Sequence, residues 1–537
     1  MLLGQDHDLV SGTALALAAT LLLVGLRRVY WHRLSHLPGP LIGKATNLFL
    51  YAICYLGVEG RVLRYYHQKY RTRVLRVGPN AVSVSDSAAI RDIYISDGGF
   101  IKDERYENFN LGPVRTIFSA IDTAYRDERA KAVAPLFAPS RLRSASTEPG
   151  GSITECVADF VRLVRDLKEE QQQHHTKENG QNGKAGPFPR SPRAPVVVDL
   201  LDACARLCID ATTAYLVGSR YGGLREIDGL AAEARQKAKL SANPFIFAIV
   251  RFARFSLLPG WIFQLAYSVS SWLNASDEVA SSFARLDQFA EEAVRRTIDG
   301  VGAGNGAGHH GHDDDTYQRR LLDAGISPAE TEAQVKAIVF AGADSVAVML
   351  ATTLFHLVRD EGARRRLRDE IRAARATQGA AVDPQTLPFL RAVVKEGLRL
   401  GMANPARLTR VVPPRGLNVG GTYVPGGTVV GCAAYVLHHD PDTFPDPFAF
   451  RPERWLEGEE SRALRRPDMA RSWMPYGSGL RACLGKNLAQ QILHTAVAAI
   501  VESDVLEGAR TCQDKIEVIE WFNAEIKGHK LEIEWSS

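Results

Sequence analysis

The chain has 537 residues, of which 45% are hydrophobic and 23% charged, and its formal net charge is +4. This composition is typical of a globular protein and argues against a disordered or fibrous one. The near balance of charge argues against a basic nucleic-acid-binding protein. Seven scattered cysteines without a C-x-x-C pair indicate neither a zinc ribbon nor a disulfide framework. The sequence therefore predicts a reduced, cytosol-facing body.

An apolar stretch near the N-terminus, residues 10–26, contains no charged side chain. As a helix with a rise of about 1.5 Å per residue, it is just long enough to span a thin bilayer. A basic stop-transfer segment and a proline-rich hinge follow at 27–40, so the positive-inside rule places residues 1–9 in the lumen. We expect a single-pass anchor in the endoplasmic reticulum membrane with a cytoplasmic catalytic domain, and a buried helix of the fold is the alternative.

Residues 41–537 are expected to form the catalytic domain, with flexible insertions at 168–195 and 300–315. The second insertion carries three histidines, but a solvated loop is favoured there over a metal site. Helical patterning dominates the remainder, at 200–217, 226–240, 276–299, 328–376, 386–400 and 484–502. Short strands are predicted at 73–77, 81–85, 417–419, 422–424, 428–431 and 530–535. This mixture predicts a mainly α (α+β) body with small sheets at its edges.

One cysteine, Cys483, lies in a glycine-rich loop directly before an amphipathic helix. A thiolate at this position would be close to the helix N-terminus and to its backbone N–H groups. Arg481 could meet a carboxylate beside whatever the sulfur binds. Since a lone cysteine is ordinarily a small buried apolar residue, the loop alone leaves both a ligand and a structural role open.

The loop resembles the cysteine-loop signature of the cytochrome P450 family, the haem-thiolate monooxygenases. That signature is Phe-x-x-Gly-x-Arg-x-Cys-x-Gly, and this chain has Tyr476-x-x-Gly479-x-Arg481-x-Cys483-x-Gly485. Tyrosine stands where phenylalanine is usual, and its hydroxyl needs a partner. The resemblance covers roughly residues 37–535. It implies the cytochrome P450 fold and a haem b whose iron is ligated by the Cys483 thiolate, with Tyr476 and Arg481 beside it.

Glu396 and Arg399 are three residues apart on a predicted helix and so share one of its faces. Alone, such a pair is commonly a surface ion pair of little value. It is similar to the Glu-x-x-Arg pair of the family, which an arginine from a later Pro-Glu-Arg segment, here Arg454, completes. The resemblance implies a buried network that stabilises the fold rather than one that acts in the chemistry.

The predicted helix 328–358 contains Asp344 and Ser345 within an apolar stretch, where buried polar groups require partners. Helix packing is the plain explanation for them. The stretch resembles the oxygen-activation motif of the family, with serine in place of the usual threonine. The hydroxyl is kept and the methyl that restricts its rotamer is lost. The resemblance implies that Asp344 and Ser345 are catalytic and organise proton delivery to bound oxygen.

The resemblance also implies arginines at the haem propionates, which need fixed cationic partners. Arg129, with Tyr125 four residues before it, and Arg410 match such positions, and a surface arginine is the alternative for each. The apolar segment 242–263 is expected to dip into the membrane surface or shape an entry channel, and a buried helix pair is the alternative. The positions that match the pocket lining of the family are Phe109, Phe118, Ala341, Met402, Ala403, Asn404 and Phe522.

No flavin or nicotinamide fingerprint is present in the chain, so electrons must come from outside. The resemblance implies NADPH-cytochrome P450 reductase, which carries FAD and FMN, as donor, with cytochrome b5 as a further candidate. Lys131 and Lys486 could steer it, and a solvated face is the alternative. The expected reaction is oxidation of an apolar small molecule, and the sequence resembles fungal biosynthetic members that act on secondary-metabolite intermediates. The alternatives are a haem-thiolate isomerase or dehydratase that needs no external electrons, and a haem-binding scaffold.

Overall fold

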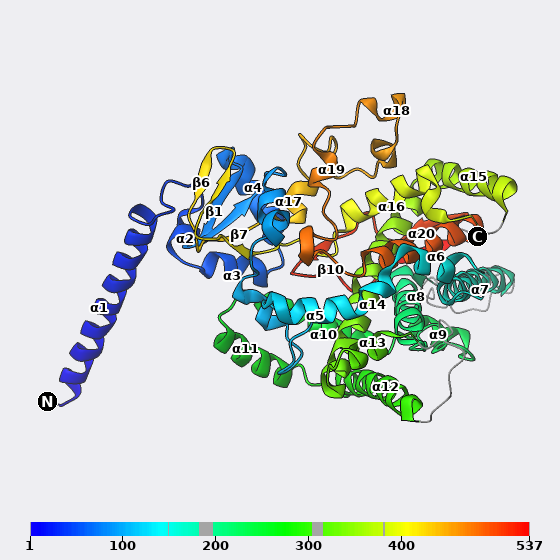
Figure 1. Ribbon diagram of the computed structural model, residues 1–537, viewed down its shortest axis with the longest axis horizontal. Helices are drawn as coiled ribbons and strands as arrows, with labels where there is room; N and C mark the ends of the chain where they lie inside the picture. The colour runs from blue at the N-terminus through cyan, green and yellow to red at the C-terminus, as the bar shows by residue number, and fades with distance from the viewer. Residues whose placement is uncertain (1, 149, 182–196, 303–314, 380–381, 536–537) are drawn as a thin grey trace.

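The computed structural model describes residues 2–148, 150–181, 197–302, 315–379 and 382–535 (Figure 1). Helices dominate it, as expected. Their bounds are α1 Leu2–Tyr30, α2 Leu41–Ala45, α3 Leu48–Tyr55, α4 Glu59–Tyr70, α5 Thr123–Val133, α6 Pro139–Thr147, α7 Ser152–Gln181, α8 Leu200–Val217, α9 Ala232–Lys237, α10 Asn243–Phe252, α11 Gly260–Leu273, α12 Asp277–Gly302, α13 Tyr317–Asp323, α14 Pro328–Arg359, α15 Glu361–Gln378, α16 Pro388–Gly401, α17 Ala434–His438, α18 Glu459–Arg462, α19 Met469–Ser472 and α20 Lys486–Glu502.

Short helical turns and strands make up the rest of the regular structure. The turns are η1 Arg91–Ile95, η2 Ser96–Gly98, η3 Glu104–Phe109, η4 Ala134–Phe137, η5 Ala253–Phe255, η6 Pro384–Thr386, η7 Pro452–Trp455 and η8 Gly479–Arg481. The strands are β1 Val74–Gly78, β2 Ala81–Val84, β3 Val198–Asp199, β4 Arg410–Val411, β5 Leu417–Val419, β6 Thr422–Val424, β7 Val429–Gly431, β8 Ala509–Thr511, β9 Val518–Glu520, β10 Ala524–Ile526 and β11 Glu532–Trp535.

The strands form small sheets at the edges of the helical body. The largest has the order β1-β2-β7-β4, in which only the β2–β7 pair is parallel. The others have the orders β3-β11-β8, β9-β10 and β5-β6, and all of their pairs are antiparallel. This arrangement confirms the predicted mainly α (α+β) fold with peripheral sheets.

Helix α14 runs through the centre of the helical body and contacts α8, α12, α16 and α20 (Figure 1). Its central glycine has a packing reason: a Cβ at Gly342 would lie 2.4 Å from Thr212 Oγ1 on α8. Helix α16 approaches from another side as closely, since a Cβ at Gly397 would lie 2.0 Å from Thr353 Oγ1 on α14. Close backbone approach on two sides therefore fixes α14 as the core of the fold.

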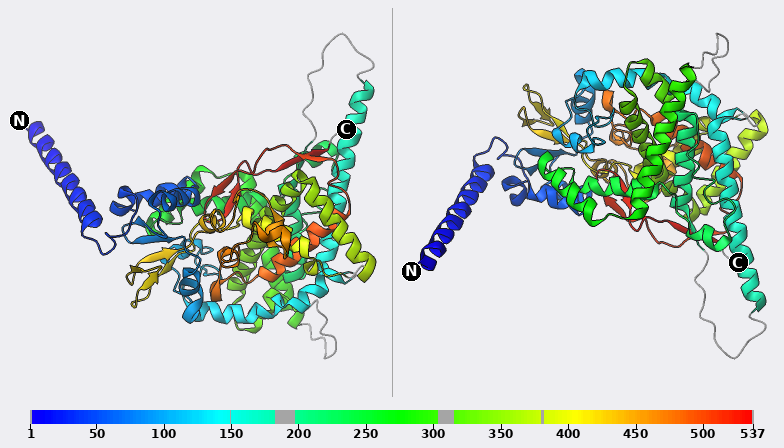
Figure 2. Two further views of the ribbon diagram at one scale, coloured as in Figure 1. Left: turned by 90° about the horizontal axis from the view of Figure 1, so that it is seen from above. Right: turned by 90° about the horizontal axis from the view of Figure 1, so that it is seen from below.

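Helix α1 projects away from the body in all three views (Figures 1 and 2). Among the described residues it contains a stretch, Gly12–Tyr30, that is long and apolar enough to cross a membrane, and none of it is buried in the protein. The helix is longer than the predicted span 10–26 at both ends. Helix α14 is apolar enough as well, but it is mostly buried and serves as the core helix.

Two predicted helical ranges differ from the structure. The prediction for 226–240 was wrong over most of its length, because α9 occupies only its middle. Asp210 on α8 accepts hydrogen bonds from the backbone N–H groups of Gly222, Gly223 and Leu224 at 2.7, 2.8 and 2.9 Å. These bonds fix the loop that directly precedes the range 226–240. The range 328–376 is interrupted at Asp360, whose side chain accepts from Ala363 N at 2.9 Å and starts α15.

The predicted insertions begin later than expected. Helix α7 continues to Gln181, so the first part of 168–195 is helical, and the part from residue 182 lies outside the described residues. Of 300–315, residues up to 302 belong to α12 and 303–314 lie outside the described part, including the three histidines. Asp315 is described and pairs with Arg141 and Arg320.

The apolar segment 242–263 separates into two environments. Helix α10 buries Phe245, Ile246 and Val250 in the core. Helix α11, in contrast, begins with a largely exposed Trp261. The segment therefore does not form a buried helix pair, and contact of α11 with a membrane stays a prediction.

Candidate active site

The cysteine loop is a tight turn between α19 and α20. Gly477 and Gly479 have φ of 68° and 72°, a conformation that favours glycine. Cys483 N donates to Tyr476 O at 2.9 Å and closes the loop. Desolvation raises the pKa of the Cys483 thiol, while the Gly485 N–H and the Lys486 charge oppose this shift. Unlike the buried cysteines of the core, Cys483 is exposed, so a thiol fixed by backbone bonds borders open space.

Four cations converge beside this loop: Lys102, Arg126, Arg410 and Arg481. Burial lowers the pKa of Lys102 well below its ordinary value, and the charges of the three arginines lower it further. Lys102 donates to Phe118 O, Arg481 to Ala120 O and Ile121 O at 2.9 Å each, and Arg410 to Thr409 O at 2.8 Å. Among the described residues, Lys102, Arg410 and Arg481 form no ion pair with a carboxylate.

Lys102 and Arg410 are buried, Arg481 is half-buried, and an anion beside these three unpaired cations would offset their mutual repulsion. Two propionate carboxylates are anions of this kind, and the open Cys483 thiol supplies a soft ligand for iron. The donor set therefore fits haem. Lys102 and Arg126 were missed in the sequence. Arg126 and Arg129 lie on the same helix, α5, and only tertiary packing decides which of them faces the cations.

Arg129 and Tyr125, predicted at a propionate, contact Glu330 at the start of α14. Arg129 forms a bidentate ion pair with this carboxylate, one bond of which measures 3.0 Å, and the Tyr125 hydroxyl donates to it at 2.6 Å. The Arg129 guanidinium also lies over the Tyr125 ring, 3.5 Å from its centroid. The three side chains join α5 to α14.

An aromatic cluster lies next to the cations. The ring centroid of Phe522 lies 4.7 Å from that of Phe109 and 5.6 Å from that of Phe118. The ring centroid of Tyr106 lies 5.8 Å from that of Phe522. The Lys102 ammonium lies 4.8 Å from the Phe118 ring centroid. The structure thus brings together three residues that were predicted to line a pocket from segments far apart in the chain.

The remaining predicted pocket residues follow α16. Met402 ends the helix with φ of 44° and is buried. Ala403 O accepts from Ala524 N at 2.9 Å, and Asn404 Nδ2 donates to Phe522 O at 2.9 Å. These bonds hold the β9–β10 hairpin, and with it Phe522, against the end of α16.

Helix α14 has one open face. Ala341 is exposed and Ser345, four residues later on the same face, is half-buried, although the helix around them is buried. This face therefore borders open space. Asp344 lies on a different face, is buried and accepts from Asn523 Nδ2 at 3.3 Å. Burial raises the pKa of Asp344 to about 7.

Glu396, Arg399 and Arg454 form a fully buried charged network. Arg399 donates to both Glu396 oxygens at 2.8 and 2.9 Å, and Arg454 Nε donates to Oε1 at 3.0 Å. Trp455 Nε1 and Arg451 N add bonds of 2.8 and 3.0 Å to the same carboxylate. The network joins α16 to η7.

The Tyr476 hydroxyl was expected to need a hydrogen-bond partner. It is buried without such a partner among the described residues, and burial raises the pKa of this side chain. The described part of the chain also contains no group of three or more His, Cys, Asp or Glu side chains that could hold a metal ion.

A helical body with a loop-borne thiol and a cluster of cations beside it fits the class of haem-thiolate proteins. The comparisons agree: the cytochrome P450 family model matches residues 59–507. The chain is 53% identical to cytochrome P450 monooxygenase mfmF of Annulohypoxylon moriforme over 522 residues, 97% of this chain and 98% of the relative. It is 26% identical to monooxygenase hkm5 of Aspergillus hancockii (92% and 89% covered) and 27% identical to aneF of Aspergillus aculeatus (88% and 89%). The chain belongs to the cytochrome P450 family and is a monooxygenase of that family.

Proposed function

We propose that Cys483 is the thiolate ligand of the haem iron and that Lys102, Arg126, Arg410 and Arg481 hold the propionates. The observation that supports this proposal is that three of these cations, Lys102, Arg410 and Arg481, form no ion pair with a carboxylate of the described chain and lie beside an exposed thiol. When bound, the haem supplies dioxygen activation, which a cysteine thiolate favours. Arg129 and Tyr125 position α5, which carries Arg126, through their contacts with Glu330.

In the proposed reaction, the protein holds the substrate and moves protons. Ser345, half-buried on the open face of α14, would contact the bound oxygen and substrate, and Asp344 is a buried acid that can gain and lose a proton near neutral pH. The aromatic cluster of Phe109, Phe118 and Phe522 provides an apolar wall. We infer an apolar small-molecule substrate, a fungal secondary-metabolite intermediate, because the relatives named above are fungal monooxygenases. The electrons come from NADPH through a separate flavin reductase, with cytochrome b5 as a further donor.

Replacing Cys483 with serine tests this assignment. The variant is expected to lose the red-shifted Soret band of the ferrous-CO protein and at least 100-fold of its reductase-dependent NADPH turnover, because serine supplies no thiolate. Cys512→Ser is the matched control, since Cys512 is the other exposed cysteine of the described chain. An unchanged ferrous-CO band in the Cys483→Ser protein would refute the assignment.

We further propose that α1 anchors the protein in the endoplasmic reticulum membrane with the body in the cytoplasm. A second apolar surface, formed by Leu41, Leu48, Trp261 and Trp272 on α2, α3 and α11, is exposed. Helices α3 and α11 are joined through η5, where Tyr55 and Phe255 have ring centroids 5.7 Å apart. This surface lies on the part of the body from which α1 emerges (Figure 1), so it suits contact with the same bilayer.

Deletion of residues 2–26 is expected to release the body from carbonate-washed membranes while leaving reversible vesicle binding. The cut ends before Leu34 and Leu37, because both are buried in the core. Adding Trp261→Ser and Trp272→Ser should weaken vesicle binding at least tenfold, since burial of each ring contributes about 2 kcal/mol. Tyr423→Ser, an exposed aromatic on β6, is the control. Vesicle binding by the truncated protein that is equally strong with and without Trp261 and Trp272 would contradict the α11 contact.

A further inference from the structure

A small cavity with a mainly apolar lining and a few polar side chains lies beside Asp344 of α14. It has a volume of ≈ 30 Å³ and is bounded by α8, α10, α14 and the strand β10. Asp344, Glu525 and His529 are among its lining residues. A cavity of this size has room for roughly two water molecules and is too small for an organic substrate.

Two of the polar groups that line this cavity lack protein partners. Glu525 Oε2 and His529 Nδ1 are buried and make no hydrogen bond. The Glu525 side chain is only 7% exposed, so its free oxygen cannot be satisfied by bulk water. A buried polar atom without a partner is costly, and ordered water in a polar cavity is the usual solution.

The cavity is connected to the surface at one end and to Asp344 at the other. His529 Nε2 lies 3.5 Å from Glu525 Oε1 and accepts from Nη2 of the exposed Arg251 at 3.3 Å. At the inner end, Asp344 lines the same cavity and is held by Asn523, two residues before Glu525 in the hairpin. From the exposed Arg251 inward, His529 and then Glu525 follow one another, and Asp344 lines the same cavity.

We propose that Glu525 and His529 form a proton relay that refills Asp344 from solvent. The relay depends on the role proposed above for Asp344. Insertion of one oxygen atom into a C–H bond consumes dioxygen, two electrons and two protons and releases water, the electrons coming from NADPH through the reductase. Each proton that leaves Asp344 is replaced by one from Glu525 through cavity water. Glu525 regains its proton from solvent by way of the ring nitrogen His529 Nε2, so only O–H and N–H bonds are broken and formed within the relay.

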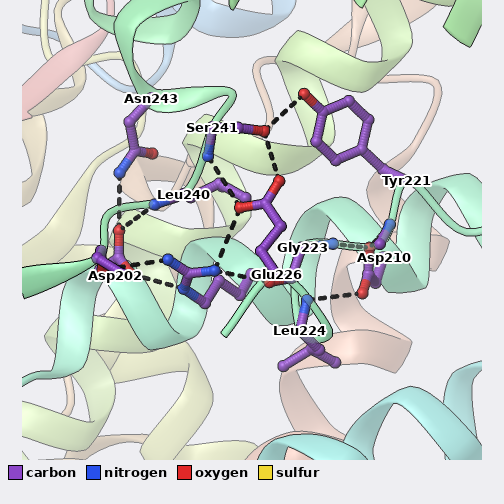
Figure 3. Close-up of polar contacts among 12 residues, drawn as sticks. Asp202, Asp210, Tyr221, Gly223, Leu224, Glu226, Leu240, Ser241 and Asn243 are labelled. Atoms are coloured by element: carbon purple, nitrogen blue, oxygen red, sulfur yellow. Dashed lines mark hydrogen bonds and ion pairs between the residues drawn. The ribbon is translucent and has the colours of Figure 1, made fainter. Parts of the chain in front are cut away.

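The other charged groups around the cavity do not compete with this relay. Asp202 also lines the cavity, but its carboxylate accepts from Arg206 Nε at 2.7 Å, Leu240 N at 2.9 Å and Asn243 Nδ2 at 2.8 Å (Figure 3). These bonds occupy the Asp202 carboxylate and hold the start of α10 against α8. Arg251 and Arg254 face Glu525 from α10 and η5.

The electrostatics suit proton exchange. Burial raises the pKa of Glu525 to about 7, against the opposing charges of Arg251 and Arg254, and that of Asp344 also to about 7. Two acids of matched pKa exchange a proton in either direction near neutral pH. Burial, and to a smaller extent the charge of Arg251, lowers the pKa of His529 to about 4. The imidazole is therefore neutral near pH 7, and a proton that it accepts is passed on rather than retained.

The experiment compares Glu525→Gln with Glu517→Gln in the full-length holoenzyme. Glu517 is the control because it lies in the same hairpin but is half exposed and paired with Lys527 at 2.8 Å. Infrared titration between pH 5 and 9 should show a protonated carboxyl that ionises near pH 7 in the wild type and in Glu517→Gln, and loses intensity in Glu525→Gln. Reductase-supported turnover should fall at least tenfold only in Glu525→Gln, with a larger solvent isotope effect, and Glu525→Asp should recover most of it.

A second readout requires no turnover. The native state keeps the Glu525 proton up to about pH 7, whereas the unfolded chain loses it near pH 4. Native Glu525 therefore binds more protons in this window, and its contribution to stability falls as the pH rises through it. This slope should be shallower in Glu525→Gln than in Glu517→Gln.

A Glu525 carboxyl that stays ionised down to pH 5 would overturn the relay. Turnover and solvent isotope effects that are the same in Glu525→Gln and Glu517→Gln would also overturn it. Loss of activity without a change of isotope effect would assign Glu525 a structural role and overturn the relay as well. If Glu525→Gln does not fold, Glu525→Asp and the wild-type titration decide the question. A wild type without a thiolate-type ferrous-CO band would instead refute the proposed haem site, and the infrared titration distinguishes the two failures.

Discussion

Glu396→Gln is expected to destabilise the protein by about 3–5 kcal/mol, the usual result of removing one partner from a buried ion network. Its carboxylate accepts bonds from Arg399, Arg454, Trp455 and Arg451 N, and neither of the first two arginines has solvent around it. An amide keeps the shape but places N–H groups against donors and leaves two buried cations without a counter-charge. Chemical unfolding followed by tryptophan fluorescence measures the loss.

Glu459→Gln is the matched control, because Glu459 pairs with Arg462 on the surface of α18. Its effect should stay within about 0.5 kcal/mol. Burial acts to raise the pKa of Glu396, but Arg399 and Arg454 outweigh it and lower this pKa. The stabilisation is therefore present above the unfolded-state pKa of about 4.3 and is lost as the pH falls through the folded-state pKa. Equal stability of the two glutamine variants at pH 7 would contradict a stabilising role for the network.

The helical core was predictable because its signals are local. Apolar periodicity located α8 at its observed bounds, and the strands β5 and β6 were also predicted residue for residue. The prediction was wrong over most of 226–240, because tertiary hydrogen bonds outweigh helix propensity there. Asp210 accepts from the backbone of the preceding loop, and Glu226 accepts from Ser241 N (Figure 3). Such bonds join residues whose partners cannot be identified before the fold is known.

The residues of the candidate site show the same difference between local sequence signals and tertiary contacts. Residues within short motifs, such as Cys483 with Arg481 and Glu396 with Arg399, could be selected because their spacing resembles motifs of the family. Lys102 and Arg126 could not, because their significance arises only where a loop, α5 and the cysteine loop converge. Glu525 was missed for the same reason: in the sequence it is one acid of a polar hairpin, and only packing against α14 and α10 buries it.

Gly479→Ala is expected to lower the haem content at least tenfold and to abolish the thiolate-type ferrous-CO band in what remains. A Cβ at this position would lie 1.7 Å from Tyr94 O, and φ is +72°, a conformation that costs alanine about 1–2 kcal/mol before any contact is counted. Tyr94 cannot yield, because its hydroxyl donates to Leu408 O and accepts from Cys432 N at 2.8 Å each. The cysteine loop must move instead, and Cys483 moves with it.

Gly485→Ala is the control within the same loop. Gly485 also belongs to the family signature, yet its φ is −80° and a Cβ there meets only Phe137 Cε1, at 3.8 Å. The backbone N–H that acts on the Cys483 thiol is kept in alanine. Haem content should therefore stay within about twofold of the wild type. Equal haem loss in both variants would show that the loop tolerates no side chain at either position, whereas full haem retention in Gly479→Ala would mean that the contact between η8 and Tyr94 does not fix the cysteine.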